Sequence, residues 1–319
     1  MGIDCIIGNS GFVGGNLLRQ HDFAECFNSR NIDDSIGSKF DTVVCAAAPG
    51  SMLQANNFPE RDLEHIETLC SKLARIKARR FVLISSIAVI ADFAGKDDES
   101  TEAFQTELAY GRHRRLLEIF CADHFDSTLI VRLPALFGHG LKKNFLFDLM
   151  NPAPSMLNSA KMEQALAVVS EADRAVLEQV YSLNVQNGMF VLDRVALGQT
   201  SAKARIENVF ELRALTSVHL THRDSMFQYY GVDRLWGDIE LAFAGGIPLL
   251  HLATEPVAAA QIHQLVTGRE MPETCARLHR EDMHSLHTGL WARTGPYLED
   301  AKQVIARVTA FVQGQQGAT

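Results

Sequence analysis

The sequence predicts an α/β protein with a doubly wound parallel sheet and a smaller C-terminal substrate lobe. Two observations lead to this prediction. Short apolar runs alternate with longer amphipathic stretches as far as about residue 135, and a glycine-rich turn follows the first apolar run immediately. The alternation is typical of strand and crossover-helix units, because helices cover both faces of a parallel sheet.

The N-terminal part of the chain contains the elements of this core. Its expected strands are apolar runs at residues 3–7, 42–46, 81–84 and 129–133. Helical patterns lie between them at about 12–20, 60–76 and 108–124. In the second of these, apolar residues recur every three or four positions with charges between them, as in a helix that packs on a sheet by one face.

The alternation ends beyond residue 141, which is why a second lobe is expected. Helices are expected at residues 157–183, 233–244 and 300–312, and short strands at 189–192 and 248–252. The expected organisation is a dinucleotide-binding core at residues 1–140 and a mixed substrate lobe at 141–319. Segments at about 226–265 are expected to return to the core sheet.

Composition excludes several classes of function. The 319 residues include 30 Lys and Arg against 38 Asp and Glu, a net charge of −8. A nucleic-acid partner is therefore disfavoured, because phosphate binding needs clustered cations. No apolar run reaches the roughly 20 residues of a membrane span. Residues 3–8 resemble a core strand rather than a signal peptide, and the six scattered cysteines are expected to be reduced. We expect a cytoplasmic protein without a membrane partner.

A glycine-rich turn joins the first expected strand to the first helix. Gly8 allows a tight turn, Gly11 lets backbone N–H groups approach a pyrophosphate, and Gly14 permits close packing of helix on strand. This context predicts a Rossmann-type dinucleotide site, and a turn without a ligand is the alternative. The other loop residues expected at the dinucleotide are Ser10, Phe12 and Val13.

The position that reads the adenosine ribose lies near the end of the next strand. Asn28 and Arg30 stand there, and no carboxylate occurs before Asp33. An acidic side chain would bond the two ribose hydroxyls of NAD, whereas Arg30 could pair with the 2′-phosphate of NADP. NADP is therefore favoured over NAD. Two alternatives stay open, namely a solvated Arg30 and recognition of NAD by Asp33 or Asp34.

Three residues predict a proton-transfer site. Ser86 ends the third expected strand, Tyr110 lies in the helix that follows, and Arg114 is four residues beyond Tyr110 on the same helix face. A neighbouring cation favours the phenolate form of a phenol, and a hydroxyl can hold the reacting oxygen. The alternatives are structural: a serine bonded to backbone, a core tyrosine and a salt-bridged arginine.

These motifs together resemble the extended short-chain dehydrogenases/reductases of the NAD-dependent epimerase/dehydratase type. The glycine turn matches that family's Gly-x-x-Gly-x-x-Gly. The further similar segments are its fourth-strand segment at residues 41–48, its serine strand at 81–86 and its sixth-strand signature at 131–138. The resemblance covers about residues 2–140 and 226–265. It is strongest to sugar-nucleotide-binding members, and it places Ala46 and Ala47 beside the cofactor.

The resemblance implies an NAD(P)-dependent oxidoreductase or epimerase acting on a small, sugar-like substrate, nucleotide-linked sugars included. Hydride would pass between the nicotinamide and a substrate carbon. Tyr110 would exchange the proton, Ser86 would hold the substrate oxygen, and Arg114 would orient cofactor and phenol. The resemblance also implies a homodimer formed by helix packing.

Two departures from the family pattern suggest a second hypothesis. Arg114 stands where the family has the lysine of Tyr-x-x-x-Lys, and Asp62 stands where many members have a helix asparagine. Arginine practically never deprotonates, so a proton relay through this position is in doubt. A dinucleotide-binding sensor or scaffold with reduced turnover is therefore the alternative. A dehydratase is less favoured, because Ile87 and Ala88 follow Ser86 where dehydratases commonly have acids.

Three weaker signals remain. Asn144, with two lysines before it, could bind a diphosphate-bearing substrate, and a solvated turn is the alternative. Arg132 lies inside an apolar strand and needs a carboxylate, a carbonyl or a ligand anion if it is buried. His279, His284 and His287 are explained better by an amphipathic helix than by a metal site, and no metal is expected.

Overall fold

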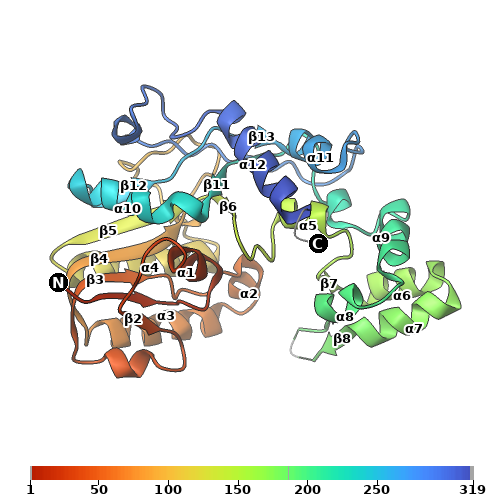
Figure 1. Cartoon of the computed structure of the whole chain (residues 1–319), viewed down its shortest axis with the longest axis horizontal. Coiled ribbons are helices and arrows are strands. Elements are labelled where there is room, and N and C mark those ends of the chain that lie inside the picture. Colours follow the sequence, from red (N-terminus) through yellow and green to blue (C-terminus); the bar gives the residue numbers. More distant parts are fainter. Residues whose placement is uncertain (1, 186, 317–319) are drawn as a thin grey trace. The chain divides into compact units, whose positions relative to one another are not determined.

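A computed structural model describes residues 2–185 and 187–316. The chain forms two compact units, each with its own hydrophobic core (Figure 1). The first unit comprises residues 2–141, 226–257 and 280–316, and the second comprises Lys142–Ser225 and Ala258–His279. The segment 280–316 thus belongs to the first unit, beyond the returning segment that the sequence predicts. None of the described helices has the length and apolar character needed to cross a membrane.

A six-stranded sheet forms the centre of the first unit, with strand order β12-β5-β4-β3-β1-β2 and all neighbours parallel. The α/β fold class predicted from the sequence is therefore confirmed. The strands are β1 (Asp4–Ile7), β2 (Glu25–Phe27), β3 (Lys39–Cys45), β4 (Lys77–Ser86), β5 (Thr128–Leu133) and β12 (Leu249–His251). The chain order reverses between β1 and β3, and sheets of this class bind ligands beyond the strand ends at such a reversal.

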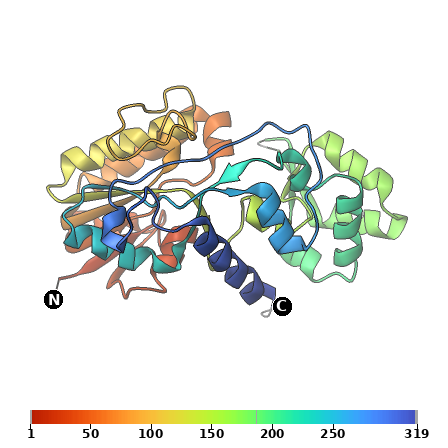
Figure 2. The same ribbon diagram turned by 90° about the horizontal axis from the view of Figure 1, so that it is seen from above.

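Helices cover both faces of this sheet (Figures 1 and 2). Alternate strand residues separate the two cores: Ile7 packs with Leu73 of one helix layer, whereas Ile6 packs with Leu235 of the other. Burying each such side chain contributes about 1.5–3 kcal/mol. The first layer holds α3 (Pro59–Leu73) and α4 (Ala109–His124), and the second holds α1 (Phe12–Leu17) and α10 (Leu235–Ala244).

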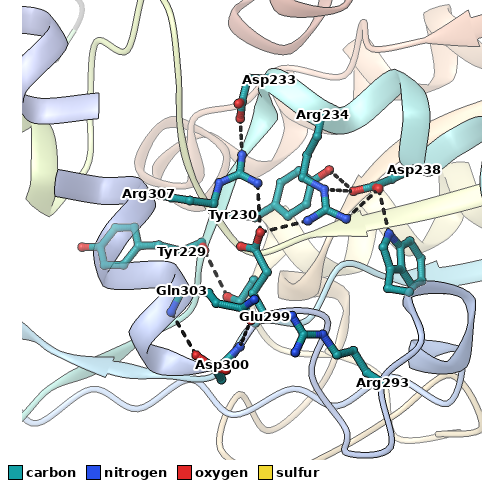
Figure 3. Close-up of polar contacts among 12 residues, drawn as sticks. Tyr229, Tyr230, Asp233, Arg234, Asp238, Arg293, Glu299, Asp300, Gln303 and Arg307 are labelled. Carbon is teal, nitrogen blue, oxygen red and sulfur yellow. Dashed lines mark hydrogen bonds and ion pairs between the residues drawn. The ribbon is translucent and has the colours of Figure 1, made fainter. Parts of the chain in front are cut away.

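The C-terminal helix of the first unit is held by a polar network (Figure 3). Glu299 accepts from Arg234 and Arg307 at 2.9 Å each, and Tyr230 donates to Asp238 at 2.6 Å. These contacts join α10, α12 (Ala301–Gln316) and the parallel pair of β6 (Ala135–Phe137) and β11 (Tyr229–Gly231). The other short elements are α2 (Met52–Asn57), η1 (Ile32–Ser35), η2 (Ile87–Val89), η4 (Val232–Arg234), η5 (Thr288–Trp291), β10 (Met226–Phe227) and β13 (Val257–Ala258).

The second unit is mainly helical, with a three-stranded antiparallel sheet in the order β7-β9-β8. Leu177, Ile206 and Phe210 lie in its core. Its strands are β7 (Met156–Leu157), β8 (Tyr181–Asn184) and β9 (Met189–Leu192). Its helices are α5 (Phe145–Met150), α6 (Ser159–Val168), α7 (Glu171–Val180), α8 (Arg194–Gly198), α9 (Lys203–Leu212), η3 (Ser217–Leu220) and α11 (Ala259–Thr267).

Two details of the sequence prediction are wrong. The helix expected at residues 157–183 is two helices, because the Ser170 hydroxyl accepts from the Asp173 N–H at 3.2 Å and starts α7 anew. The amphipathic helix expected around His284 and His287 is irregular chain. There the His284 N–H donates to the Asp97 carbonyl at 2.9 Å, so backbone groups bond to distant segments rather than to a helix.

Candidate active site

The glycine turn lies at the reversal point of the sheet. Gly8 has a φ of +96°, and a Cβ there would overlap the carbonyl of Ala46 at the end of β3. A Cβ at Gly14 would overlap the Gly8 carbonyl, whereas one at Gly11 would lie 3.3 Å from that oxygen. Glycine at positions 8 and 14 therefore brings the start of α1 against β1 and β3.

This cradle fits a dinucleotide. Ser10 and Gly11 are exposed at the turn. The Gly11 N–H donates to the Gly8 carbonyl at 3.0 Å, so the first N–H groups of α1 are the ones that suit a pyrophosphate. Phe12 and Val13 are half-buried and pack on the core of the α1 face, which gives their side chains a structural part as well. Ala46 and Ala47 are half-buried directly after β3 and pack against the two cores of the first unit.

Asparagines join the turn to the end of β2. Asn28 donates to the side chain of Asn9 at 3.3 Å and accepts from the Arg30 N–H at 3.0 Å. The Arg30 side chain is exposed, and its guanidinium makes no ion pair with any residue in the described part of the chain. Asp33 pairs with Lys72 at 2.9 Å, so its carboxylate already has a cationic partner.

Tyr110 and Arg114 stack on each other. The guanidinium carbon of Arg114 lies 4.4 Å from the centroid of the Tyr110 ring, as their spacing on one helix face predicts. The Arg114 side chain is buried and donates to Asp62 and to the carbonyl of Pro49, in the loop that follows β3. This places the Tyr110–Arg114 pair at the same edge of the sheet as Ala46 and the glycine turn.

Ser86 reaches the same region through Ala88. Its Oγ accepts from the Ala88 N–H at 3.2 Å, and Ala88 packs against Tyr110. A Cβ at Gly111 would overlap the Ala88 carbonyl, so the start of α4 lies tightly on η2. Ser86 is thus linked through Ala88 to Tyr110 and Arg114, at the strand-end edge of the sheet that also carries the glycine turn.

Asn144 marks the start of a short helix. It lies in the second unit, where its Oδ1 accepts from the Phe147 N–H at 3.0 Å and begins α5. Its φ of +111° is unusual for a residue other than glycine. This side-chain contact is a helix cap.

Sequence reasoning did not find the partners of these residues. Asp62 is a noted departure from the family pattern, but its direct ion pair with Arg114 has no sequence signal, and the contact of His113 with Asp62 has none either. Arg132 does find the carboxylate it needs, because Glu118 bonds it at 2.9 and 2.7 Å. Ser85 donates to the same carboxylate at 2.6 Å.

Other titratable groups near the site are poor catalysts. Burial raises the pKa of Cys45, at the end of β3, to about 12, so its thiol stays protonated at neutral pH. Burial also lowers the pKa of His251, whose Nδ1 faces the His284 carbonyl at 3.0 Å. Within residues 2–185 and 187–316, no group of three or more His, Cys, Asp or Glu is arranged to hold a metal ion.

Comparison with known proteins identifies a family. The sequence profile described as "NAD dependent epimerase/dehydratase family" matches residues 23–191, just over half of the chain. This match begins after the glycine turn, so the turn is an independent observation. No curated protein matches the sequence.

Solved structures share the fold at low sequence identity. A dTDP-4-dehydrorhamnose reductase from Bacillus anthracis in complex with NADP has a TM-score of 0.62 at 12% identity, over 98% of this chain and 99% of that one. A UDP-galactose 4-epimerase has a TM-score of 0.61 at 14% identity, over 99% of both chains. RMD from Pseudomonas aeruginosa, complexed with NADPH, has a TM-score of 0.58 at 15% identity, over 98% and 99%.

Proposed function

The chain belongs to the NAD dependent epimerase/dehydratase family, and from this premise we propose that it is an NAD(P)-dependent oxidoreductase or epimerase. Its proposed substrate is the carbonyl or hydroxyl group of a sugar-like molecule, with nucleotide-linked sugars as the first candidates. The observation that supports this most is the stacked Tyr110–Arg114 pair beside the glycine turn.

A bound nicotinamide dinucleotide would supply the hydride chemistry. Gly8, Gly11 and Gly14 would hold the pyrophosphate against backbone N–H groups at the start of α1. Arg114 has five N–H donors, and the contacts to Asp62 and Pro49 engage only its two terminal nitrogens. Its Nε–H makes no hydrogen bond to residues 2–185 or 187–316 and would donate to a ribose hydroxyl.

Tyr110 would exchange the proton with the substrate oxygen. The Arg114 guanidinium carbon lies 4.4 Å from the centroid of the Tyr110 ring, which puts a fixed positive charge beside the phenol during the transfer. Ser86 accepts from the Ala88 N–H, which leaves its own O–H to donate to the substrate oxygen.

The activity can be tested by NADPH oxidation with dTDP-4-dehydrorhamnose and by the NAD-supported epimerisation of UDP-galactose. Removing a positioned acid or base costs roughly 10²–10⁴-fold, so Tyr110→Phe should lower kcat at least about a hundredfold. Its Kd for NADPH, measured by fluorescence titration, should stay within about twofold of wild type. Clear NADPH binding without turnover of either sugar or of other keto sugars would overturn the proposal in favour of the sensor hypothesis.

We propose NADP rather than NAD as the preferred cofactor. The support is the exposed Arg30 without an ion-pair partner among the described residues, together with the engagement of Asp33 by Lys72. Loss of one charge-assisted contact to phosphate costs about 1.5–3 kcal/mol, so Arg30→Ala should raise the Kd for NADPH at least about tenfold. The Kd for NADH should not change. The exposed Arg19→Ala is the matched control, and an equal loss for both cofactors would contradict NADP preference.

We also propose a homodimer formed through α4. Leu116 and Ile119 lie one helical turn apart on this helix and are 46% and 44% exposed, which supports a partner on that face. Light scattering after size-exclusion chromatography measures the mass directly. A monomer at the concentration of the assay would contradict the proposal.

A further inference from the structure

We propose that Asp62, held by His113, is a positioning residue of this site. Its carboxylate fixes the Arg114 guanidinium over the Tyr110 ring and offsets the guanidinium charge, so Asp62 and Arg114 function only as a matched pair. The inference rests on the proposed function and assigns to it two residues that do not touch the reacting atoms.

The ion pair of Asp62 and Arg114 is enclosed by the protein. The two side chains are 5% and 3% exposed, and both terminal nitrogens of Arg114 face the carboxylate at 3.2–3.4 Å. A charge buried this deeply is costly unless an opposite charge accompanies it. Arg114 therefore depends on Asp62 for its place in the fold.

His113 fixes the other side of the carboxylate. Its Nδ1 lies 2.9 Å from Oδ2 of Asp62, and the ring is only 2% exposed. A carboxylate accepts hydrogen bonds and does not donate them, so Nδ1 carries the hydrogen. Nε2 faces Nη2 of Arg112 at 3.5 Å. Asp62 thus receives donors from two consecutive residues of α4, one nitrogen of His113 and two of Arg114, and cannot rotate without losing some of them.

The planar shape of the guanidinium explains why position 114 and position 62 belong together. Its two terminal nitrogens bond Asp62 and the Pro49 carbonyl, and its face covers the Tyr110 ring at 4.4 Å. A lysine ammonium would act as a point charge drawn to the carboxylate, away from the ring. With an uncharged amide at position 62, that ammonium would be free to remain near the phenol.

A double-mutant cycle tests this pairing. Asp62→Asn, Arg114→Lys and the double variant are compared in kcat, in whichever of the two assays named above gives the higher wild-type activity. Each single variant should lose at least about tenfold in kcat, and the double variant should lose no more than either single variant. The KM for the sugar should change less than about threefold, because Asp62 acts on the reaction step and not on sugar binding. Thermal unfolding midpoints without NADPH should show the same non-additivity.

A matched control separates positioning from stability. Asp173→Asn removes a carboxylate from another ion pair, 6% exposed and 2.7 Å from Arg205 in the second unit. Asp173→Asn should lower the unfolding midpoint and leave kcat within about twofold of wild type. His113 provides a milder pair of variants if Asp62→Asn does not fold. His113→Asn keeps a donor for Oδ2 and should retain most of kcat, whereas His113→Leu should lose at least about fivefold.

The outcomes separate the two proposals. A wild-type protein without turnover in either assay would overturn the proposed function and this inference together. An active wild type would overturn this inference alone if Asp62→Asn keeps its kcat, if the losses of the two single variants multiply in the double variant, or if His113→Asn and His113→Leu are equally active.

Discussion

Gly8 has a backbone conformation that side-chain-bearing residues rarely adopt, and it adopts it where two strands and a helix meet. Its N–H donates to the carbonyl of Phe27 at 2.7 Å, and its Cα faces the carbonyl of Ala46. One residue thereby connects β1, β2 and β3 at the turn. The space that a Cβ would take is filled by the backbone of Ala46 and Ala47.

Substitution of Gly8 tests the cradle directly. Gly8→Ala should lower the free energy of unfolding by at least about 1–2 kcal/mol, the cost of a left-handed conformation, with steric overlap added to it. NADPH binding should weaken at least about tenfold, because the turn must shift. Gly15→Ala is the control: its Cβ would lie 3.8 Å from the nearest atom, in a helix that alanine favours. Thermal unfolding and NADPH fluorescence measure both effects, and equal behaviour of the two variants would contradict the prediction.

His251 makes stability depend on pH. Burial, aided by Arg132, lowers its pKa against the attraction of Glu99, so the folded ring stays neutral. The unfolded chain takes up a proton near pH 6.5, and the free energy of unfolding should therefore be constant above about pH 7 and fall by up to about 1.4 kcal/mol per pH unit below 6.5. His251→Gln should flatten this decline, and the exposed His65→Gln should not. Urea titrations from pH 5 to 8 measure the free energy of unfolding at each pH. If that free energy changed with pH equally in the wild type and both variants, His251 would not be the cause.

At the level of elements, one polar row joins three neighbouring strands. Ser85, Arg132 and His251 are aligned in register on β4, β5 and β12, one beside the next. Glu118 on α4 accepts from Ser85 and Arg132, and all four side chains are buried. Because α4 also carries Tyr110, this row ties the strand that ends in the catalytic serine candidate to the helix of the tyrosine.

Loss of the Glu118 charge should therefore destabilise the whole first unit. Glu118→Gln leaves Arg132 buried without a full counter-charge, which typically costs about 3–5 kcal/mol. Glu64→Gln, on the exposed face of α3, should cost less than about 0.5 kcal/mol. Urea denaturation gives both values. A loss below about 1 kcal/mol for Glu118→Gln would show that the row is dispensable.

On the scale of the whole molecule, the two units have separate cores and one of them lacks tryptophan. Both tryptophans of the chain, Trp236 and Trp291, lie in the first unit. Ile6 is fully buried in the core of the first unit and Ile206 in the core of the second. Tryptophan fluorescence therefore reports on the first unit alone, whereas far-UV circular dichroism reports on both.

This difference predicts separable unfolding. Ile206→Ala should lower stability by about 2–5 kcal/mol and move part of the circular dichroism transition to lower urea, leaving the fluorescence transition in place. Ile6→Ala should move the fluorescence transition. NADPH should raise the midpoint of the fluorescence transition of the wild type, because the glycine turn lies in the first unit. If both probes shifted together in every variant, the units would unfold as one.

Sequence alone determined the features that are local to the chain. The glycine turn follows from backbone conformation at Gly8 and Gly14, and the stack of Arg114 on Tyr110 follows from helix geometry at a spacing of four. The alternation of apolar runs with amphipathic stretches predicted the parallel sheet, because a strand buried on both faces is apolar along its whole length. Ser86 and its register with the tyrosine helix required the family resemblance in addition.

Tertiary structure alone decided which side chains became partners. Asp62 and its partner Arg114 are far apart in sequence. Arg132 and its partner His251 are far apart as well, and no pattern in the chain pairs either set. Crossovers bring α3 beside α4 and β12 beside β5, and burial then demands a counter-charge for each charge removed from water. The residues around His284 are irregular because their backbone groups form hydrogen bonds with other segments and not with one another.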